Sequence, residues 1–155
     1  MCFYISAQRA IARLDKAAVG AGGNEEKLRA YIAENTACTG QEEYFVFLPP
    51  REDIFSLHEA ADILISASRS EGFSYAILEM LSIGGKVVMS DIPGTRWAKE
   101  YAATINFASG DAERCAEAIE TARVMPVDSE AIAKAVRDAY SIDKWTVAVI
   151  EQYGI

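Results

Sequence analysis

The chain has 155 residues, of which 51% are hydrophobic and 25% charged, and its formal net charge is −8. This length corresponds to about one domain, and the apolar content is sufficient for a single hydrophobic core. The acidic balance argues against a nucleic-acid partner and against an anionic membrane surface, because both attract basic proteins.

Targeting signals and cysteines give little sign of an exported or membrane-spanning protein. No apolar run is long enough to span a membrane, and the first residues lack a signal-peptide pattern. Cys2, Cys38 and Cys115 are odd in number, lie far apart and form no metal-binding motif. We therefore expect a cytoplasmic protein, with the inner face of a membrane as an alternative location for a full-length form. Cys115, on the apolar side of a predicted helix, is expected to be a core residue.

Short apolar segments alternate with helical patterns along the chain. Five strands are predicted, near Ala17–Val19, Tyr44–Leu48, Ile63–Ser66, Lys86–Met89 and Thr104–Phe107. Helices are predicted over Gln8–Leu14, from about Glu25, over Tyr75–Ile83 with Gly84 past its end, from Ala112, after Ser129 and at the C-terminal end. This alternation predicts an α/β fold with a Rossmann-like parallel sheet and helices on both faces.

Helical spacing predicts which side of each later helix is apolar. For the helix that follows the N-cap Asp111, this side holds Cys115, Ala116, Ile119 and Ala122, and for the next helix it holds Ile132, Ala135, Val136 and Ala139. The last helix has an apolar stripe of Trp145, Ala148, Val149 and Tyr153. The only histidine, His58, is expected on a solvated helix surface.

The most informative segment is Ser70–Glu79, which places Glu71 and Glu79 eight positions apart across a predicted strand-to-helix turn. Glu71 falls at the carboxyl end of a strand, where open α/β sheets bind ligands, and Glu79 falls about one turn into the helix that Ser74 caps. The backbone N–H groups of residues 73–75 would attract a phosphate. Because ionised carboxylates accept hydrogen bonds from hydroxyl groups, the pattern indicates a sugar joined to a nucleoside diphosphate as the ligand.

This segment resembles the C-terminal, donor-binding domain of retaining glycosyltransferases of the GT-B fold (group 1), whose signature is two glutamates separated by seven residues. The resemblance continues through Met80–Gly94, where the family has a helix, a glycine stop, a strand and a Ser-Asp-x-x-Gly loop. Further similar blocks are Ala17–Gly22, Phe45–Pro49, Ala60–Asp62, Ser109–Glu113 and Tyr140–Trp145. The similarity therefore covers most of the chain from about residue 17 onward.

The resemblance implies one half of a GT-B fold within a single domain, 1–155. Residues 17–139 would form the nucleotide-sugar-binding unit and residues 140–155 a C-terminal helix, with the N-terminal acceptor domain absent. Glu71, the implied catalytic residue, would contact donor-sugar hydroxyls and Glu79 the ribose. The other implied substrate-binding residues are Gly72, Phe73, Ser74, Tyr75 and Arg51. For Arg51, in a loop that lies against the base in the family, a purely solvated role is an equal alternative.

The implied activity is transfer of a hexosyl group, with retention, from a UDP- or GDP-sugar to a glycan, lipid or small acceptor. No cofactor or metal is expected, and the sequence has no Asp-x-Asp cluster that could hold a divalent cation on a diphosphate. Without an acceptor domain the chain alone is expected to be inactive. The family's diphosphate-binding Arg/Lys loop is not matched in residues 1–16. The alternative is a non-catalytic or truncated nucleotide-binding or interaction module. Surfaces left bare by a missing acceptor domain would favour a homodimer. Arg69 and Arg96 would either add positive charge near the phosphates or pair with surface carboxylates.

Overall fold

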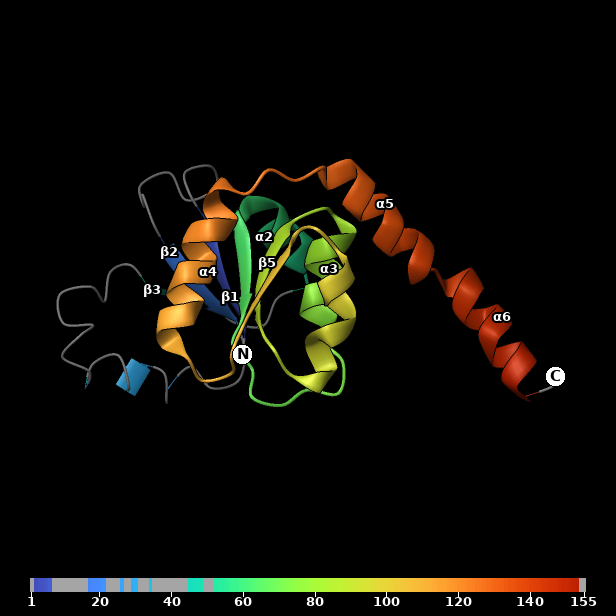
Figure 1. Ribbon diagram of the computed structural model, residues 1–155, viewed down its shortest axis with the longest axis horizontal. Coiled ribbons are helices and arrows are strands. Elements are labelled where there is room, and N and C mark those ends of the chain that lie inside the picture. The colour runs from blue at the N-terminus through green and yellow to red at the C-terminus, as the bar shows by residue number, and fades with distance from the viewer. Residues whose placement is uncertain are drawn as a thin grey trace.

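A computed structural model of the chain describes residues 2–6, 17–21, 45–48 and 52–153, together with Glu26, Arg29, Ala30 and Glu34. Its strands and helices alternate through most of this length (Figure 1). The strands are β1 (Cys2–Ser6), β2 (Ala17–Ala21), β3 (Phe45–Leu48), β4 (Ile63–Ser66), β5 (Lys86–Ser90) and β6 (Thr104–Phe107). The helices are α2 (Ile54–Ala60), α3 (Tyr75–Ser82), the 3-10 helix η3 (Pro93–Glu100), α4 (Ala112–Val124), α5 (Ser129–Ala139) and α6 (Ile142–Tyr153).

The six strands form one sheet in the order β3-β2-β1-β4-β5-β6. Strands β4, β5 and β6 are parallel to one another, and β2 is parallel to β3. All five strands predicted from the sequence are present, and the α/β, Rossmann-like class is confirmed.

Strand β1 was not predicted, and it runs antiparallel to both of its neighbours, β2 and β4. Its first residue, Cys2, lies opposite Ala21 on one side and Ser66 on the other. Residues 7–16 separate β1 from β2, which is short for the crossover of about a dozen residues that a parallel pair requires. The predicted helix Gln8–Leu14 lies outside the described residues.

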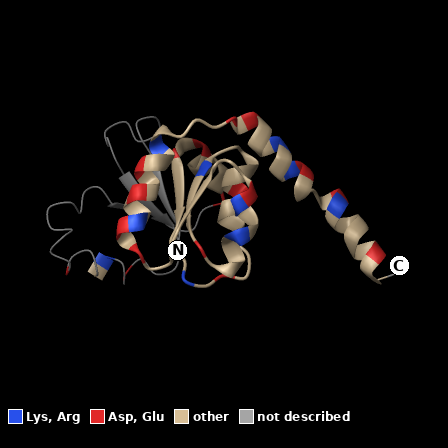
Figure 2. Ribbon diagram, in the orientation of Figure 1, with Lys and Arg blue, Asp and Glu red and all other residues tan. Residues whose placement is uncertain are grey.

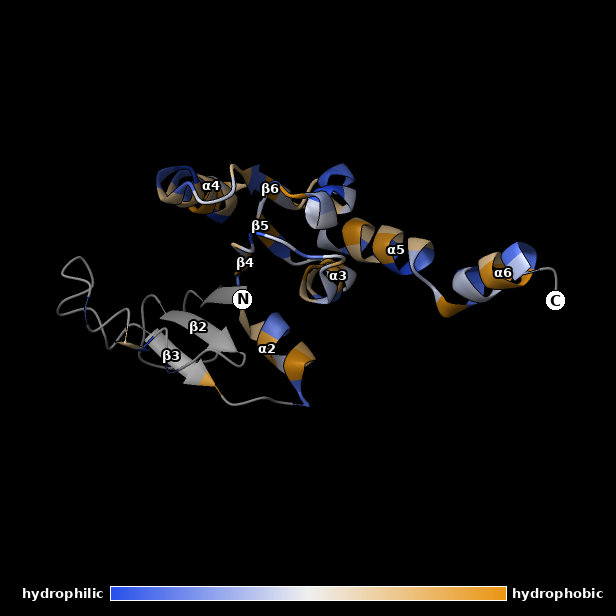
Figure 3. Ribbon diagram, turned by 90° about the horizontal axis from the view of Figure 1, so that it is seen from below, coloured by the Kyte–Doolittle hydropathy of each residue, from blue (hydrophilic) through white to orange (hydrophobic). Residues whose placement is uncertain are grey.

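Helices cover both faces of the parallel half of the sheet, as the sequence predicted. Figure 3 shows α4 on one side of β5 and β6 and α3 on the other. Alternate strand residues point to opposite faces, so Leu64 packs in a core with α3 and α5 while its neighbours Ile63 and Ile65 pack in a core with α4. The α3-side core includes Ile77, Met80, Leu81, Val87, Met89, Ile132 and Val136, and the α4-side core includes Val88, Phe107, Ala118 and Ala122.

Helix α4 begins where the sequence predicted, but one of its predicted core positions is wrong. The carboxylate of Asp111 accepts a hydrogen bond from the backbone N–H of Arg114 at 2.9 Å, which is an N-cap. Cys115 is partly buried, and burial raises the pKa of its thiol. Ala116 is exposed, however, and Ala118 is buried instead. Alanines occur on both sides of this helix, so their spacing could not identify the buried side.

The same error occurs in α5, where Ala133 is buried and the predicted Ala135 and Ala139 are exposed. Gly84 ends α3 as predicted, with a φ of 77°. A Cβ at Gly84 would lie 2.1 Å from the carbonyl oxygen of Ser129, so only glycine lets α5 begin this close to α3. Where a helix from about Glu25 was predicted, the four described residues are helical and exposed.

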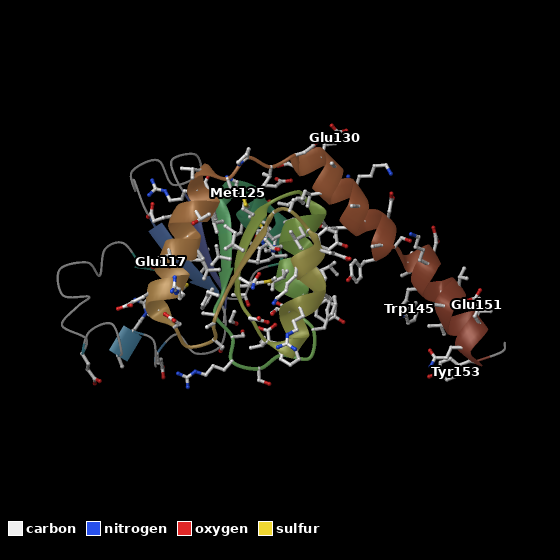
Figure 4. The ribbon with its side chains drawn as sticks, viewed as in Figure 1. Glu117, Met125, Glu130, Trp145, Glu151 and Tyr153 are labelled. Carbon is white, nitrogen blue, oxygen red and sulfur yellow. The ribbon has the colours of Figure 1, made fainter. Side chains whose placement is uncertain are left out.

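Helix α6 extends away from the sheet and has no buried residue (Figure 1). Trp145 and Tyr153 project from it, 65% and 70% exposed (Figure 4). The apolar stripe predicted on this helix is therefore open to solvent. Acidic and basic residues are interspersed on α4 and α5 (Figure 2), where three exposed ion pairs join residues three or four positions apart. Among the described residues, no helix combines the length and the hydrophobicity needed to cross a membrane.

Candidate functional site

The loop that follows β4 holds Glu71 in place through two serine hydroxyls. Ser68 donates a hydrogen bond to the carboxylate of Glu71, and Ser90, at the end of β5, donates one to the backbone carbonyl of Ser68. Glu71 is half-buried as a result. The sequence prediction that Glu71 lies at the carboxyl end of a parallel strand is confirmed.

The 3-10 helix η3 packs its backbone directly on this loop. A Cβ added to Gly94 would lie 2.1 Å from the carbonyl oxygen of Glu71 and 3.1 Å from that of Gly72. Thr95, fully buried, donates a hydrogen bond of 2.7 Å to the carbonyl of Ser90, which fastens η3 to the end of β5. The Gly of the Ser-Asp-x-x-Gly loop is thus required by a close contact between two backbones.

Helix α3 presents its amino terminus at the same edge of the sheet. Ser74 is the N-cap residue, extended and only 3% exposed, but its hydroxyl makes no capping hydrogen bond. The N–H groups of the first helical turn therefore have no partner from Ser74, and an uncapped helix N-terminus attracts anions. Gly72, Phe73 and Tyr75, the remaining predicted residues of this turn, are exposed beside it.

Glu79 lies in the second turn of α3 and contacts His58 of α2. Its Oε2 is 3.3 Å from Nε2 of His58, and 33% of its side chain is exposed. A hollow of about 340 Å³ opens next to Glu79, with Phe55, Leu78 and Tyr140 on its apolar wall.

The prediction that His58 is solvated is wrong, because His58 is 1% exposed. Burial lowers the pKa of its imidazole, and the hydrogen bond and negative charge of Glu79 act in the opposite direction. The seven-residue helix α2 is too short for apolar periodicity to show that His58 turns toward α3.

An aromatic cluster that sequence reasoning missed lies beside the Glu71 loop. The rings of Phe73 and Trp97 stack with their centroids 4.7 Å apart, and Tyr140 contacts both rings at 6.0 and 5.2 Å. Trp97 also donates its ring N–H to the carbonyl of Gly94 at 3.1 Å. These aromatic residues come from segments far apart in the sequence, so no local pattern could have grouped them.

The arginines considered for phosphate binding differ in their surroundings. Arg96 bonds to Asp91 at 3.1 Å, and Lys99 bonds to the same carboxylate at 2.8 Å. The hydrogen bond from Lys99, and next that from Arg96, lower the pKa of Asp91 below its usual value. Arg96 therefore pairs with a carboxylate, one of the two roles considered for it. Arg69 is exposed, and Arg51 lies outside the described residues.

A second hollow, of about 390 Å³, lies at the opposite end of the strands. Its lining includes Asp62 and Lys86, at the amino ends of β4 and β5, and Ser129 at the start of α5. It is slightly larger than the hollow beside Glu79, but in open α/β sheets ligands bind outside the carboxyl ends of the strands. Cavity size alone therefore does not identify the site.

The structure brings the predicted turn residues 71–75 together at the carboxyl end of β4, with Glu79 further along α3. The arrangement offers an anion site at an uncapped helix N-terminus and a carboxylate on each side of it along the chain. Whether these residues bind a substrate stays a prediction.

Several solved structures share the fold of this chain. HepE from Anabaena, solved in complex with UDP, superposes with a TM-score of 0.75 at 19% identity, over 89% of this chain and 40% of that one. A glycosyltransferase from Rickettsia africae gives 0.73 at 21% identity, over 87% and 38%. Sucrose-phosphate synthase from Thermosynechococcus elongatus gives 0.69 at 16% identity, over 87% and 36%. This chain thus spans well under half the length of each of these three proteins.

Among curated proteins, no sequence matches the chain. A family model does match: residues 2–125 fit the model described as "Glycosyl transferases group 1". The matched segment contains both glutamates, the Gly94 loop and all six strands. Together with the Rossmann-like sheet and its structural neighbours, this match shows that the chain belongs to the group 1 glycosyltransferases and has the fold of a C-terminal GT-B domain.

Proposed function

We propose that the chain is the donor-binding domain of a retaining glycosyltransferase and that its ligand is a UDP- or GDP-linked sugar. One observation carries the proposal: the uncapped amino terminus of α3 lies between two glutamates, Glu71 before it and Glu79 within it. Few ligands other than a nucleotide sugar combine a diphosphate with hydroxyl groups on both sides of it. The UDP bound in the solved HepE structure makes UDP the first ligand to test.

In this proposal each part of the turn has one task. The N–H groups at the start of α3 bind the diphosphate and stabilise the charge that develops on it as it leaves. Glu79 accepts hydrogen bonds from the ribose hydroxyls, and Glu71, held by Ser68, accepts them from the sugar. Gly72, where an added Cβ would meet no atom within 4 Å, leaves room for the ligand.

For a whole protein that contains this chain, the proposal concerns the acceptor surface, the cellular setting and the role of metal. Transfer requires a surface that binds the acceptor, and this chain spans 36–40% of the length of the three structural neighbours. We propose that another part of a longer protein, or a partner, supplies this surface. We also propose a cytoplasmic setting. Metal-independent transfer is part of the same proposal, and it is supported by the lack of an Asp-x-Asp cluster in this sequence. An unchanged UDP affinity in EDTA is the expected result.

NMR titration of the ¹⁵N-labelled chain with UDP and GDP tests the binding site. We expect chemical-shift changes over residues 71–79 and a loss of affinity in Glu79→Gln. A charge-assisted hydrogen bond contributes about 1.5–3 kcal/mol, or roughly ten- to a hundredfold in Kd. Glu117→Gln, on α4 (Figure 4), is the matched control, because it removes the same charge from an exposed ion pair. Shifts confined to the hollow at Lys86 and Ser129 would contradict the proposal.

A non-catalytic nucleotide-binding module is the second candidate, favoured by the absence of the family's Arg/Lys loop from residues 1–16. The two candidates differ at Glu71, which contacts only the donor sugar. If the chain is a donor domain, Glu71→Gln weakens binding of the nucleotide sugar that serves as its donor, and it leaves the affinity for free UDP unchanged. A panel of UDP- and GDP-sugars that all bind like the free nucleotide, with no effect of Glu71→Gln, would favour the module.

A further inference from the structure

The contact between His58 and Glu79 joins a buried titratable ring to a partly exposed carboxylate. His58 is 1% exposed, whereas 33% of the Glu79 side chain is exposed. The two atoms that meet, Nε2 of His58 and Oε2 of Glu79, are 3.3 Å apart. The contact crosses from α2 to α3, so it fixes the side chain of one helix from another.

Glu79 is therefore held on its inner side and open on its outer side. The outer side borders the hollow of about 340 Å³ that Phe55, Leu78 and Tyr140 also line. A hydrogen bond to Oε2 leaves the second carboxylate oxygen, with two lone pairs, for a ligand. Since a free glutamate side chain has several rotamers, a donor on the inner side reduces the freedom that ligand binding must remove.

We propose that His58 is a positioning residue for Glu79: its Nε2–H holds one carboxylate oxygen so that the other faces the ribose hydroxyls of a bound nucleotide. This inference rests on the proposed function, because it takes Glu79 as the ribose contact. It adds a residue outside the two-glutamate motif and on another helix. A neutral ring suffices for the task, and the pKa of His58 is lowered, mainly by burial, which favours that form.

Two substitutions separate positioning from packing. His58→Gln loses the ring but has an amide nitrogen that can reach about the place of Nε2 and donate to Glu79. His58→Phe keeps a ring of similar volume and has no donor. Positioning predicts that the glutamine variant retains UDP affinity and the phenylalanine variant loses it, whereas packing alone predicts the opposite order.

UDP titrations of the 155-residue chain, followed by NMR, measure these affinities. We expect a roughly three- to tenfold higher Kd for His58→Phe, as for loss of one hydrogen bond, and a Kd within about twofold of the original for His58→Gln. Ile119→Ala, a partly buried position on α4 across the sheet, controls for general destabilisation. Equal affinities for the Phe variant and the unsubstituted chain would overturn the inference while leaving the proposed function intact. If the unsubstituted chain binds neither UDP nor GDP, the proposed function fails as well.

A ligand-free measurement tests the same contact. The ¹⁵N shifts of the His58 ring report which nitrogen carries the proton, and we expect it on Nε2, with a change in the Nε2 signal in Glu79→Gln. A proton on Nδ1 alone would overturn the inference, because Nε2 could then not donate to a carboxylate. This readout requires no nucleotide, so it separates failure of the contact from failure of the binding site.

Discussion

Replacement of Gly94 by alanine should damage the Glu71 loop through a single methyl group. The new Cβ would lie 2.1 Å from the carbonyl oxygen of Glu71 and 2.7 Å from its carbonyl carbon. Both contacts are with backbone, so no flexible side chain can turn away. Ordinary van der Waals contact begins near 3.4 Å, and η3 must therefore move away from the loop by about 1 Å.

We expect this movement to affect stability and binding together. Overpacking of a tight site lowers the free energy of unfolding by about 1–3 kcal/mol. Because Gly72 and the start of α3 follow Glu71 directly, the displaced loop should also weaken UDP binding by about tenfold, the equivalent of one lost hydrogen bond. Urea unfolding measures the first effect, and NMR titration of the folded protein measures the second.

Two other glycines are internal controls. Gly84→Ala creates an equally close contact, with Ser129, and has a φ of 77°, but it lies at the far end of the strands. It should destabilise the chain and leave the UDP affinity of the folded form unchanged. Gly72→Ala meets no neighbouring atom, so it should not lower the free energy of unfolding. If Gly94→Ala unfolds at the same urea concentration as the unsubstituted chain and binds UDP equally well, the contact between Gly94 and the Glu71 backbone does not require glycine.

Three further results are expected. The purified 155-residue chain should transfer no sugar, because alignment of donor and acceptor lowers the activation barrier of such reactions by roughly 7–11 kcal/mol. Sugar transfer by this chain that Glu71→Gln abolishes would refute the prediction. Burial raises the pKa of Tyr101 to about 12, so stability should fall as the pH rises above about 10, where Tyr101 ionises in the unfolded chain but not in the folded one. Urea unfolding at about pH 9 and about pH 11 measures this fall, and Tyr101→Phe should reduce it. The exposed stripe of α6 should make the chain self-associate, because each 100 Å² of buried apolar area contributes about 2.5 kcal/mol to association. Light scattering should show smaller particles for Trp145→Ser than for the unsubstituted chain. A strictly monomeric unsubstituted chain would contradict this expectation.

The sequence predicted those features that depend on local patterns. Strands β4 and β5 appear in the sequence as short apolar runs. The helices that start after Ser74 and Asp111 appear as capping residues followed by helical patterns, so each is encoded within a few neighbouring residues. The turn around Glu71 was predicted for the same reason, since strand, loop and helix follow one another directly.

Features that depend on long-range packing were missed or wrong. The burial of His58 is decided by α3, some twenty positions further along the chain, and the stacking of Phe73 on Trp97 by the position of η3. The antiparallel direction of β1 depends on its pairing with both β2 and β4, which no pattern within residues 2–6 encodes. In α4, Ala116 was predicted to be buried, but Ala118 is buried instead. Nearby alanines are equally apolar, so the sequence pattern does not distinguish the buried one from the exposed one.

The hydroxyl network under Glu71 has a consequence for the kinetics of ligand capture. Ser68, Ser90 and Thr95 hold the loop in one arrangement before any ligand is present. A nucleotide that meets a loop of this kind has no ordering step to wait for, so the observed association rate should increase linearly with nucleotide concentration and show a single phase. Removing the Ser90 hydroxyl would loosen the arrangement, and a rate that levels off at high nucleotide concentration would then reveal the slow closure that the network normally makes unnecessary.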